Sequence, residues 1–296
     1  MNKSDLLLNK KAALSRPLIL DGAFGSVLQQ RGFSADKDLW FSYLSISEPQ
    51  AVLQLHKEYV DAGADIITTN TFRTNPSAKK KSNLAITNSD FVKRSVTLAI
   101  QAKGETDIII AGSNAPAEDC YQKERTISLF DLDYNHKKHI ELLYESGCDI
   151  IWNETHSHLD EIEIVCKFCS ENSIPYSMNI YFDESLKLLS GEPIDEAIRL
   201  IKNFPPQAIG FNCIKPTDFE NLLDKIQMPG NFGFYLNCGS GAVTAQHISC
   251  GISPENYVGY IKEFVRFSPT FVGSCCGSNP AHTNAIKEYF DEAYRN

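Results

Sequence analysis

The sequence predicts an α/β fold built as a single (β/α)8 barrel, and three observations support that prediction. Short apolar runs alternate with amphipathic segments along most of the 296-residue chain. Eight such runs can be counted, which is the number of strands that this barrel needs. Polar or reactive residues follow most of the runs directly, and the carboxyl ends of the strands are where such barrels carry their functional groups. The alternative architecture is an open, doubly wound sheet.

The eight runs are rich in β-branched residues and apolar on both faces, as buried parallel strands are. In chain order they are Leu18 to Leu20, Asp65 to Thr69, Ile108 to Gly112, Asp149 to Asn153, Tyr176 to Tyr181, Ala208 to Asn212, Gly233 to Leu236 and Thr270 to Gly273.

The segments between the runs have helical spacing. In the first of them Pro49 stands in the first turn, where proline is tolerated, and Gly63 supplies a stop signal. Helices are expected at residues 48–62, 136–147, 160–171, 192–203, 216–226, 254–266 and 280–293. No internal repeat or Pro/Gly/Ser-rich linker interrupts the pattern, so residues 1–296 are expected to form one domain.

Composition favours a small-molecule partner. The formal net charge is −9, and the only basic cluster, Lys79 to Lys81, is short enough to be a solvated helix start, which argues against nucleic-acid binding. No apolar stretch is long enough for a membrane helix or a signal peptide, so a cytoplasmic protein is expected. Nine cysteines are then better explained as reduced thiols or metal ligands than as disulfides.

Three cysteines follow predicted strands and form the strongest candidate site. Cys213 follows the sixth run, and Cys275 and Cys276 follow the eighth, where Gly277 lets the backbone turn. Three thiolates suit zinc and leave one tetrahedral position open, as in a catalytic site. The alternatives are that these cysteines are small core residues, or that the adjacent pair forms a strained disulfide.

The other cysteines and histidines carry weaker signals. Cys166 and Cys169 fall inside a helical pattern and are expected to pack in the core. Cys120, Cys148 and Cys250 are also expected to pack, whereas Cys238 is a candidate to line the site. His156 and His158 are expected at the surface or behind the site and not as a metal pair, and His136 and His139 at solvated helix positions.

The chain resembles the homocysteine S-methyltransferase family, including the S-methylmethionine-dependent and betaine-dependent enzymes. The resemblance rests on Leu20 to Ser26 (LDGAFGS), Leu39-Trp40, the block HKEYVDAGADIITTNTF at 56–72, Glu154-Thr155, GFNC at 210–213 and Cys275-Cys276-Gly277. Two segments depart from the family pattern, GSNAP at 112–116 and YLNCG at 235–239. Arg73, which follows the long block, receives no role from the sequence.

The resemblance implies a zinc-dependent enzyme that methylates homocysteine from a sulfonium donor, S-methylmethionine or S-adenosylmethionine. Asp21 and Glu154 are expected to pair with the substrate ammonium group, and the backbone of Gly22 and Ala23 with its carboxylate. Asn212 is expected to support Cys213 at the substrate site. Three aromatic residues are candidates to face the cationic donor: Phe24, Trp40 and Phe72. The alternatives are a betaine-type or other onium donor, or a barrel that binds zinc or a thiol without turnover.

Overall fold

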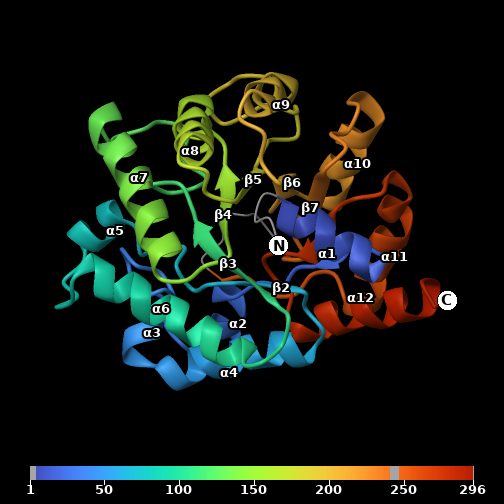
Figure 1. Cartoon of the computed structure of the whole chain (residues 1–296), viewed down its shortest axis with the longest axis horizontal. Coiled ribbons are helices and arrows are strands. Elements are labelled where there is room, and N and C mark those ends of the chain that lie inside the picture. Colours follow the sequence, from blue (N-terminus) through green and yellow to red (C-terminus); the bar gives the residue numbers. More distant parts are fainter. Residues whose placement is uncertain (1–4, 241–246, 296) are drawn as a thin grey trace.

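The barrel prediction is confirmed by the structure, a computed structural model that describes residues 5–240 and 247–295. Eight parallel strands lie in the order β1-β8-β7-β6-β5-β4-β3-β2, and helices surround them (Figure 1). The strands are β1 (Leu18–Ile19), β2 (Ile66–Thr68), β3 (Ile109–Asn114), β4 (Ile150–His156), β5 (Tyr176–Ile180), β6 (Ala208–Asn212), β7 (Phe232–Leu236) and β8 (Phe271–Ser274).

The two ends of the strand order meet, so the sheet forms a ring. Leu20 and Ile66 form an isolated parallel bridge between the first and second strand segments. The backbone N–H of Asp21 donates to the Ile66 carbonyl at 2.9 Å, and that of Asp65 to the Ile19 carbonyl at 2.7 Å. Each expected run coincides with one strand. β3, β4 and β8 extend beyond the ends of their runs, β4 as far as His156, and β7 begins one residue before its run. The residues expected after strands therefore gather at one end of the barrel.

All seven expected helices are present. The structure has α1 (Leu6–Leu14), α2 (Gly25–Gln30), α3 (Leu44–Ser47), α4 (Pro49–Asp61), α5 (Pro76–Lys81), α6 (Asn88–Lys103), α7 (Leu129–Glu145), α8 (Leu159–Glu171), α9 (Ile194–Lys202), α10 (Pro216–Lys225), α11 (Pro254–Phe264), a 3-10 turn (Val265–Phe267) and α12 (Pro280–Ala293). The lysines at 79–81 end α5, so their assignment to a helix start was wrong.

The longest helix that the sequence did not predict is α6. Its amino terminus is capped by Thr87, whose hydroxyl accepts from the Asp90 N–H at 3.0 Å. Its buried face carries Phe91, Val92 and Val96. This helix supplies the covering between β2 and β3 that the other strand pairs obtain from expected helices.

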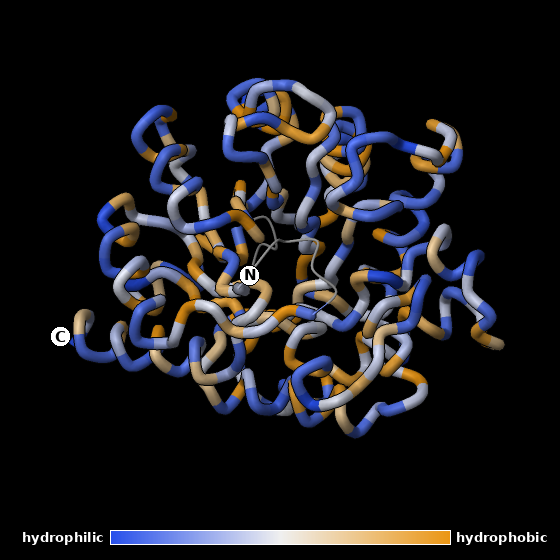
Figure 2. The backbone as a smooth tube through the Cα atoms, turned by 180° about the vertical axis from the view of Figure 1, so that it is seen from behind, coloured by the Kyte–Doolittle hydropathy of each residue, from blue (hydrophilic) through white to orange (hydrophobic). Residues whose placement is uncertain are grey.

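The core has two layers. Most buried side chains lie between the strands and the outer helices, and a second cluster fills the inside of the barrel with Trp152, Tyr235 and Phe271 among its members. Leu7 of α1 belongs to this inner cluster. Figure 2 shows hydrophobic stretches along the central strands and mixed stretches along the outer helices. Apolar burial on both strand faces explains the continuous apolar runs in the sequence.

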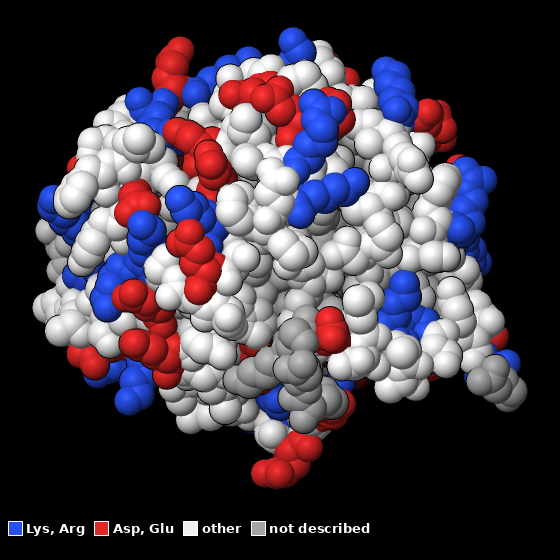
Figure 3. All heavy atoms as spheres, turned by 45° about the horizontal axis from the view of Figure 1, so that its top comes forward, with Lys and Arg blue, Asp and Glu red and all other residues white. Residues whose placement is uncertain are grey.

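On the face shown in Figure 3, acidic and basic side chains are interspersed without a large basic patch. Within residues 5–240 and 247–295, every helix is too short or too polar to span a membrane.

Candidate metal centre and active-site cavity

A cavity of about 560 Å³ opens at the carboxyl ends of the strands. Its wall takes residues from the ends of seven strands, from β1 to β4 and from β6 to β8. Nearly all candidate site residues line it: Asp21, Gly22, Ala23, Phe24, Trp40, Phe72, Glu154, Cys213, Cys275 and Cys276. The positions expected from the strand ends therefore converge on one space.

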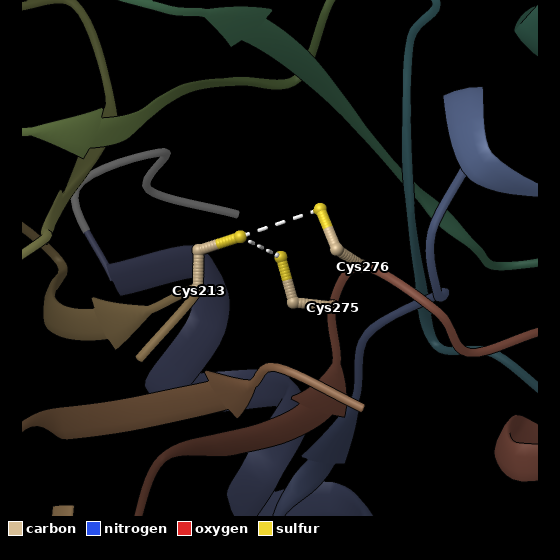
Figure 4. A group of neighbouring side chains, drawn as sticks. All are labelled: Cys213, Cys275 and Cys276. Carbon is tan, nitrogen blue, oxygen red and sulfur yellow. Dashed lines mark hydrogen bonds between the residues drawn. The ribbon is translucent and has the colours of Figure 1, made fainter. Parts of the chain in front are cut away.

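Three sulfur atoms converge on one side of this cavity (Figure 4). The Cys275 sulfur lies 2.9 Å and the Cys276 sulfur 3.4 Å from that of Cys213. All three sulfurs lie within 4.8 Å of one another, and none of the three cysteines is in a disulfide. A tetrahedral zinc ion with Zn–S bonds of about 2.3 Å would hold its sulfurs about 3.8 Å apart. The two sulfur–sulfur contacts are shorter than this, so the thiols would separate by less than about 1 Å to hold such an ion.

Backbone conformation brings the sulfurs together. Cys213 follows β6 with a φ of 58°, and Gly277 has a φ of 86° directly after the cysteine pair. A Cβ atom at Gly277 would lie 2.5 Å from the Gly239 Cα, so a larger residue would collide with the chain after β7. Glycine is required here for both its φ and its small size.

The three thiols share their protons unequally. Hydrogen bonding with Cys275, and then with Cys276, lowers the pKa of Cys213 well below its usual range. The same contacts raise the pKa of Cys275 and of Cys276. The Tyr121 hydroxyl also donates to the Cys213 sulfur, at 3.2 Å. Cys213 is thus the position at which a thiolate forms most readily.

Two carboxylates lie beside the cysteines. Asp21 accepts the Thr68 backbone N–H at 2.8 Å, and Glu154 accepts hydrogen bonds from the Ser113 and Tyr235 hydroxyls, the second at 3.1 Å. Burial raises the pKa of Asp21 well above its usual value. Burial also raises the pKa of Glu154 to about 7, against the opposing effect of its two hydroxyl partners. Both groups would be stabilised as anions by a cationic ligand.

The backbone beside Asp21 is occupied within the protein. The Ala23 N–H donates to the Ser278 hydroxyl at 3.0 Å, and the Ala23 carbonyl accepts from the Tyr59 hydroxyl at 2.6 Å. The Ala23 N–H therefore has a partner within the protein, and its pairing with a substrate carboxylate stays a prediction. Gly22 lines the cavity, and a Cβ there would lie 2.8 Å from the Ser278 hydroxyl oxygen.

Asn212 is absent from the described wall of the cavity. Its side chain is buried, accepts the Thr155 N–H at 2.9 Å and donates to the Thr155 hydroxyl at 2.9 Å. The structure thus does not bring Asn212 to a substrate position. Through these two hydrogen bonds Asn212, at the end of β6, is linked to Thr155 near the end of β4. Thr155 has a φ of 63°.

The three aromatic candidates divide into two groups. Trp40 and Phe72 lie with ring centroids 5.6 Å apart, and both line the cavity. Phe24 also lines the cavity but packs on the buried His56, with centroids 4.5 Å apart. Trp40 and Phe72 therefore form the aromatic surface that a cation could approach.

Sequence reasoning missed several residues of the wall, among them Tyr121 and Cys120. Tyr121 lies 92 positions from its partner Cys213 and carries no motif. Cys120, expected to pack, is half-buried and lines the same cavity. The only signal that could have pointed to them is their place in the connection after the third strand, since such connections build the sites of these barrels.

The remaining cysteines give mixed outcomes. Cys148, Cys166 and Cys169 are buried as expected. Cys250 is exposed, so the expectation that it packs was wrong. Cys238 is buried and is not part of the described cavity wall.

The histidines of α7 are buried, against expectation. His136 and His139 are fully buried, as is His156 at the end of β4. His136 lies 2.6 Å from the Glu161 carboxylate, and His139 contacts Asn114 and Thr74 at 2.8 Å each. Both histidines obtain polar partners from neighbouring elements, which is how polar groups are accommodated in a core.

Known proteins resemble this chain in sequence and in architecture. The sequence profile of the homocysteine S-methyltransferases matches residues 18–290. Homocysteine S-methyltransferase 1 of Arabidopsis thaliana is 24% identical, over 95% of this chain and 98% of that protein. Homocysteine S-methyltransferase of Escherichia coli strain K12 is 24% identical, over 91% and 94%.

A solved structure agrees in fold. The homocysteine methyltransferase MmuM from Escherichia coli, in a metallated form, superposes with a TM-score of 0.77 at 23% identity, over 97% of this chain and 100% of that one. Because the family profile spans nearly the whole sequence, this chain belongs to the homocysteine S-methyltransferase family.

Proposed function

We propose that this protein transfers a methyl group from a sulfonium donor to the sulfur of homocysteine, giving methionine, with one zinc ion held by Cys213, Cys275 and Cys276. The convergence of the three sulfurs in the cavity wall carries this proposal. Membership of the family supports it, as does the metallated form of the Escherichia coli relative. The reducing cytoplasm, where three thiols stay reduced, is the compartment that suits such a site.

The donor set fits a catalytic metal better than a structural one. Structural zinc sites use four protein ligands, whereas three leave one position for substrate. Zinc held by three thiolates lowers the pKa of a thiol that enters the fourth position and keeps that sulfur electron-rich. Among the described residues, Tyr121 is the one side chain outside the cluster that hydrogen-bonds to a cluster sulfur. Its hydroxyl donates to Cys213 and so disperses the charge on that sulfur.

The carboxylates orient the amino-acid end of homocysteine. The charge of Glu154 contributes, after burial, to the raised pKa of Asp21, so the two carboxylates lie close enough to interact. A substrate ammonium group between them would stabilise their charged forms. Ser113 and Tyr235 hold the Glu154 carboxylate in place. Homocysteine is thereby fixed with its sulfur toward the cysteines.

Methyl transfer then follows from alignment. The homocysteine thiolate attacks the methyl carbon from the side opposite the donor sulfur, and the bond between that carbon and the donor sulfur breaks. The electron pair stays on the donor sulfur, which leaves as a neutral thioether. Trp40 and Phe72 present ring faces to the positive sulfonium before transfer. No covalent intermediate with a protein residue is needed.

Methionine formation by the reduced, zinc-loaded protein tests the proposal. Homocysteine is held constant while S-methylmethionine, S-adenosylmethionine and betaine are offered separately. Turnover with a sulfonium donor is expected. Turnover with betaine alone would replace the donor class, and bound zinc without turnover on any donor would favour a binding protein or another thiol acceptor.

A further inference from the structure

Arg73 is a cation in the wall of the cavity. It follows Phe72 in the connection between β2 and α5, is half-buried and lines the cavity. Its guanidinium lies over the Phe72 ring, with the Cζ atom 5.5 Å from the ring centroid. Its backbone N–H donates to the Ser42 hydroxyl at 3.0 Å, which fixes the start of the side chain.

The guanidinium is only partly satisfied by the protein. One terminal nitrogen, Nη1, donates to the carbonyls of Pro116 and Glu118. Arginine carries five N–H donors, so those of Nε and Nη2 remain. Among the residues that the structure describes, no carboxylate oxygen lies within 4.0 Å of Arg73.

The cavity's other basic groups differ from Arg73. Lys81 is exposed, and its charge already lowers the pKa of Glu118. Lys37 is exposed as well. A half-buried, unneutralised guanidinium is costly to maintain, and its planar fork matches a carboxylate. Arg73 is therefore the wall's strongest candidate for binding an anionic group of a ligand.

The proposed acceptor site lies in another part of the cavity from Arg73. The acceptor is held by the cysteines and by Asp21 and Glu154, which line the cavity at the ends of β1 and β4. Phe72 contacts Trp40 on one side and Arg73 on another. A sulfonium on this aromatic pair would thus have its own carboxylate within the range of the guanidinium.

From this arrangement we infer that Arg73 binds a carboxylate of the methyl donor, so that the donor class is a sulfonium that also carries a carboxylate. This inference rests on the proposed function. It gives a role to a residue that the sequence left without one, and it distinguishes amino-acid and other acidic sulfoniums from simple trialkyl sulfoniums.

The test compares S-methylmethionine with its methyl ester, which keeps the sulfonium and lacks the carboxylate charge. Dissociation constants are measured by calorimetry and kcat/KM by methionine formation. Wild type should bind and use the acid about 10- to 100-fold better than the ester, which is the effect expected of a charge-assisted hydrogen-bonded pair. Arg73→Met should remove that preference, with little change for the ester, and Arg73→Lys should retain part of it.

Arg125→Met is the matched control. Arg125 anchors the same β3–α7 connection through Asp160, with one contact at 2.8 Å, and is not part of the described cavity wall. If Arg73 only held this connection in place, both variants would weaken acid and ester equally, and the inference would fail. A selective rise in the KM for homocysteine in Arg73→Met would also overturn the inference. So would a loss of the preference for the acid over the ester in Lys81→Met.

The binding data separate this inference from the proposed function. Preference for the acid that depends on Arg73, without turnover, would leave the subsite intact and contradict methyl transfer. Turnover with equal use of acid and ester by wild type would uphold the transfer and contradict the role of Arg73.

Discussion

Two clusters of metal-ligating side chains lie at the same end of the barrel, and they differ in access. Cys213, Cys275 and Cys276 line the cavity. His136, His156 and Glu161 also bring ligand atoms within 4.8 Å of one another, and all three are buried. The first cluster can admit a ligand, whereas the second has no exposed member.

The second cluster is satisfied mainly by its own neighbours. His136 bonds to Glu161 at 2.6 Å, and the same carboxylate oxygen accepts the Ala117 N–H at 2.9 Å. His156 lies 3.2 Å from the Asn114 carbonyl. Burial opposes the charge on Glu161, but the hydrogen bond and charge of His136 outweigh it and hold the pKa of Glu161 well below its usual range.

Comparison of the two shows that proximity of ligand atoms does not by itself make a metal site. The cysteine cluster lines an open cavity, whereas the histidine cluster is buried and supports the connection at Ala117. That connection continues to Tyr121, which contacts Cys213. We therefore propose metal binding at the cysteines and a structural role for His136, His156 and Glu161.

The largest expected effect is that of Cys276→Ser. Loss of one of three thiolates should remove zinc and lower turnover by more than about 100-fold. Loss of a group that only hydrogen-bonds to a metal ligand costs about 10- to 100-fold, and loss of a ligand itself should cost more. Metal content and methionine formation are measured on the same preparation. Cys250→Ser, at an exposed cysteine, should leave both unchanged. Full zinc and full turnover in Cys276→Ser would refute the ligand assignment.

Glu161→Ala should destabilise the fold without changing zinc content. Removing the carboxylate leaves the buried His136 Nε2 and the Ala117 N–H without their partner, at a cost of about 1–3 kcal/mol for each in the free energy of unfolding. Urea denaturation measures this cost. Glu163→Ala, on the exposed face of the same helix, should change it little. A drop from two bound zinc ions to one in Glu161→Ala would show that the buried cluster is a metal site.

His156→Gln should flatten the acid dependence of stability. Burial lowers the pKa of His156 to about 4, against about 6.5 in an unfolded chain. Between these values the unfolded state binds the proton and the folded state does not, so stability is full above about pH 6.5 and falls toward pH 4. The total is about 3 kcal/mol for this group.

The measurement is the free energy of unfolding at several pH values between 4 and 7. Wild type should lose stability more steeply than His156→Gln, by up to about 1.4 kcal/mol per pH unit. His247→Gln, at an exposed histidine, serves as the control. Equal slopes in wild type and His156→Gln would contradict a neutral, buried His156.

Tyr121→Phe should give the smallest effect. It removes the hydroxyl that donates to the Cys213 sulfur, and such partners of metal ligands change affinity by about 10-fold or more. Competition with a chelator measures zinc affinity. Tyr134→Phe, at an exposed tyrosine, should have no effect. Unchanged affinity in Tyr121→Phe would mean that the hydroxyl does not support the metal centre.

The strands and the cysteine cluster could be predicted from local sequence. Apolar runs indicate buried parallel strands. Cys275, Cys276 and Gly277 are adjacent, so the turn at Gly277 can be predicted from that short segment. Cys213 could be added because strand ends of one barrel meet at the same rim. These features depend on short segments and on the topology alone.

Features that depend on distant partners could not be predicted. The contact of Tyr121 with Cys213 is set by the path of the β3–α7 connection, and nothing near residue 121 encodes it. His136 and His139 were expected at solvated helix positions, and nothing in the neighbouring sequence encodes their burial. Their partners, Glu161, Asn114 and Thr74, come from other elements. The hydrogen bond of the Ala23 N–H is another such feature, since its partner Ser278 comes from the far end of the chain.

Zinc-edge X-ray absorption of the loaded protein, before and after addition of homocysteine, tests the central claim most directly. The account predicts three sulfur ligands at about 2.3 Å and one lighter atom before addition, and four sulfurs afterwards. A first shell dominated by nitrogen and oxygen, or a sulfur count that homocysteine does not change, would contradict it.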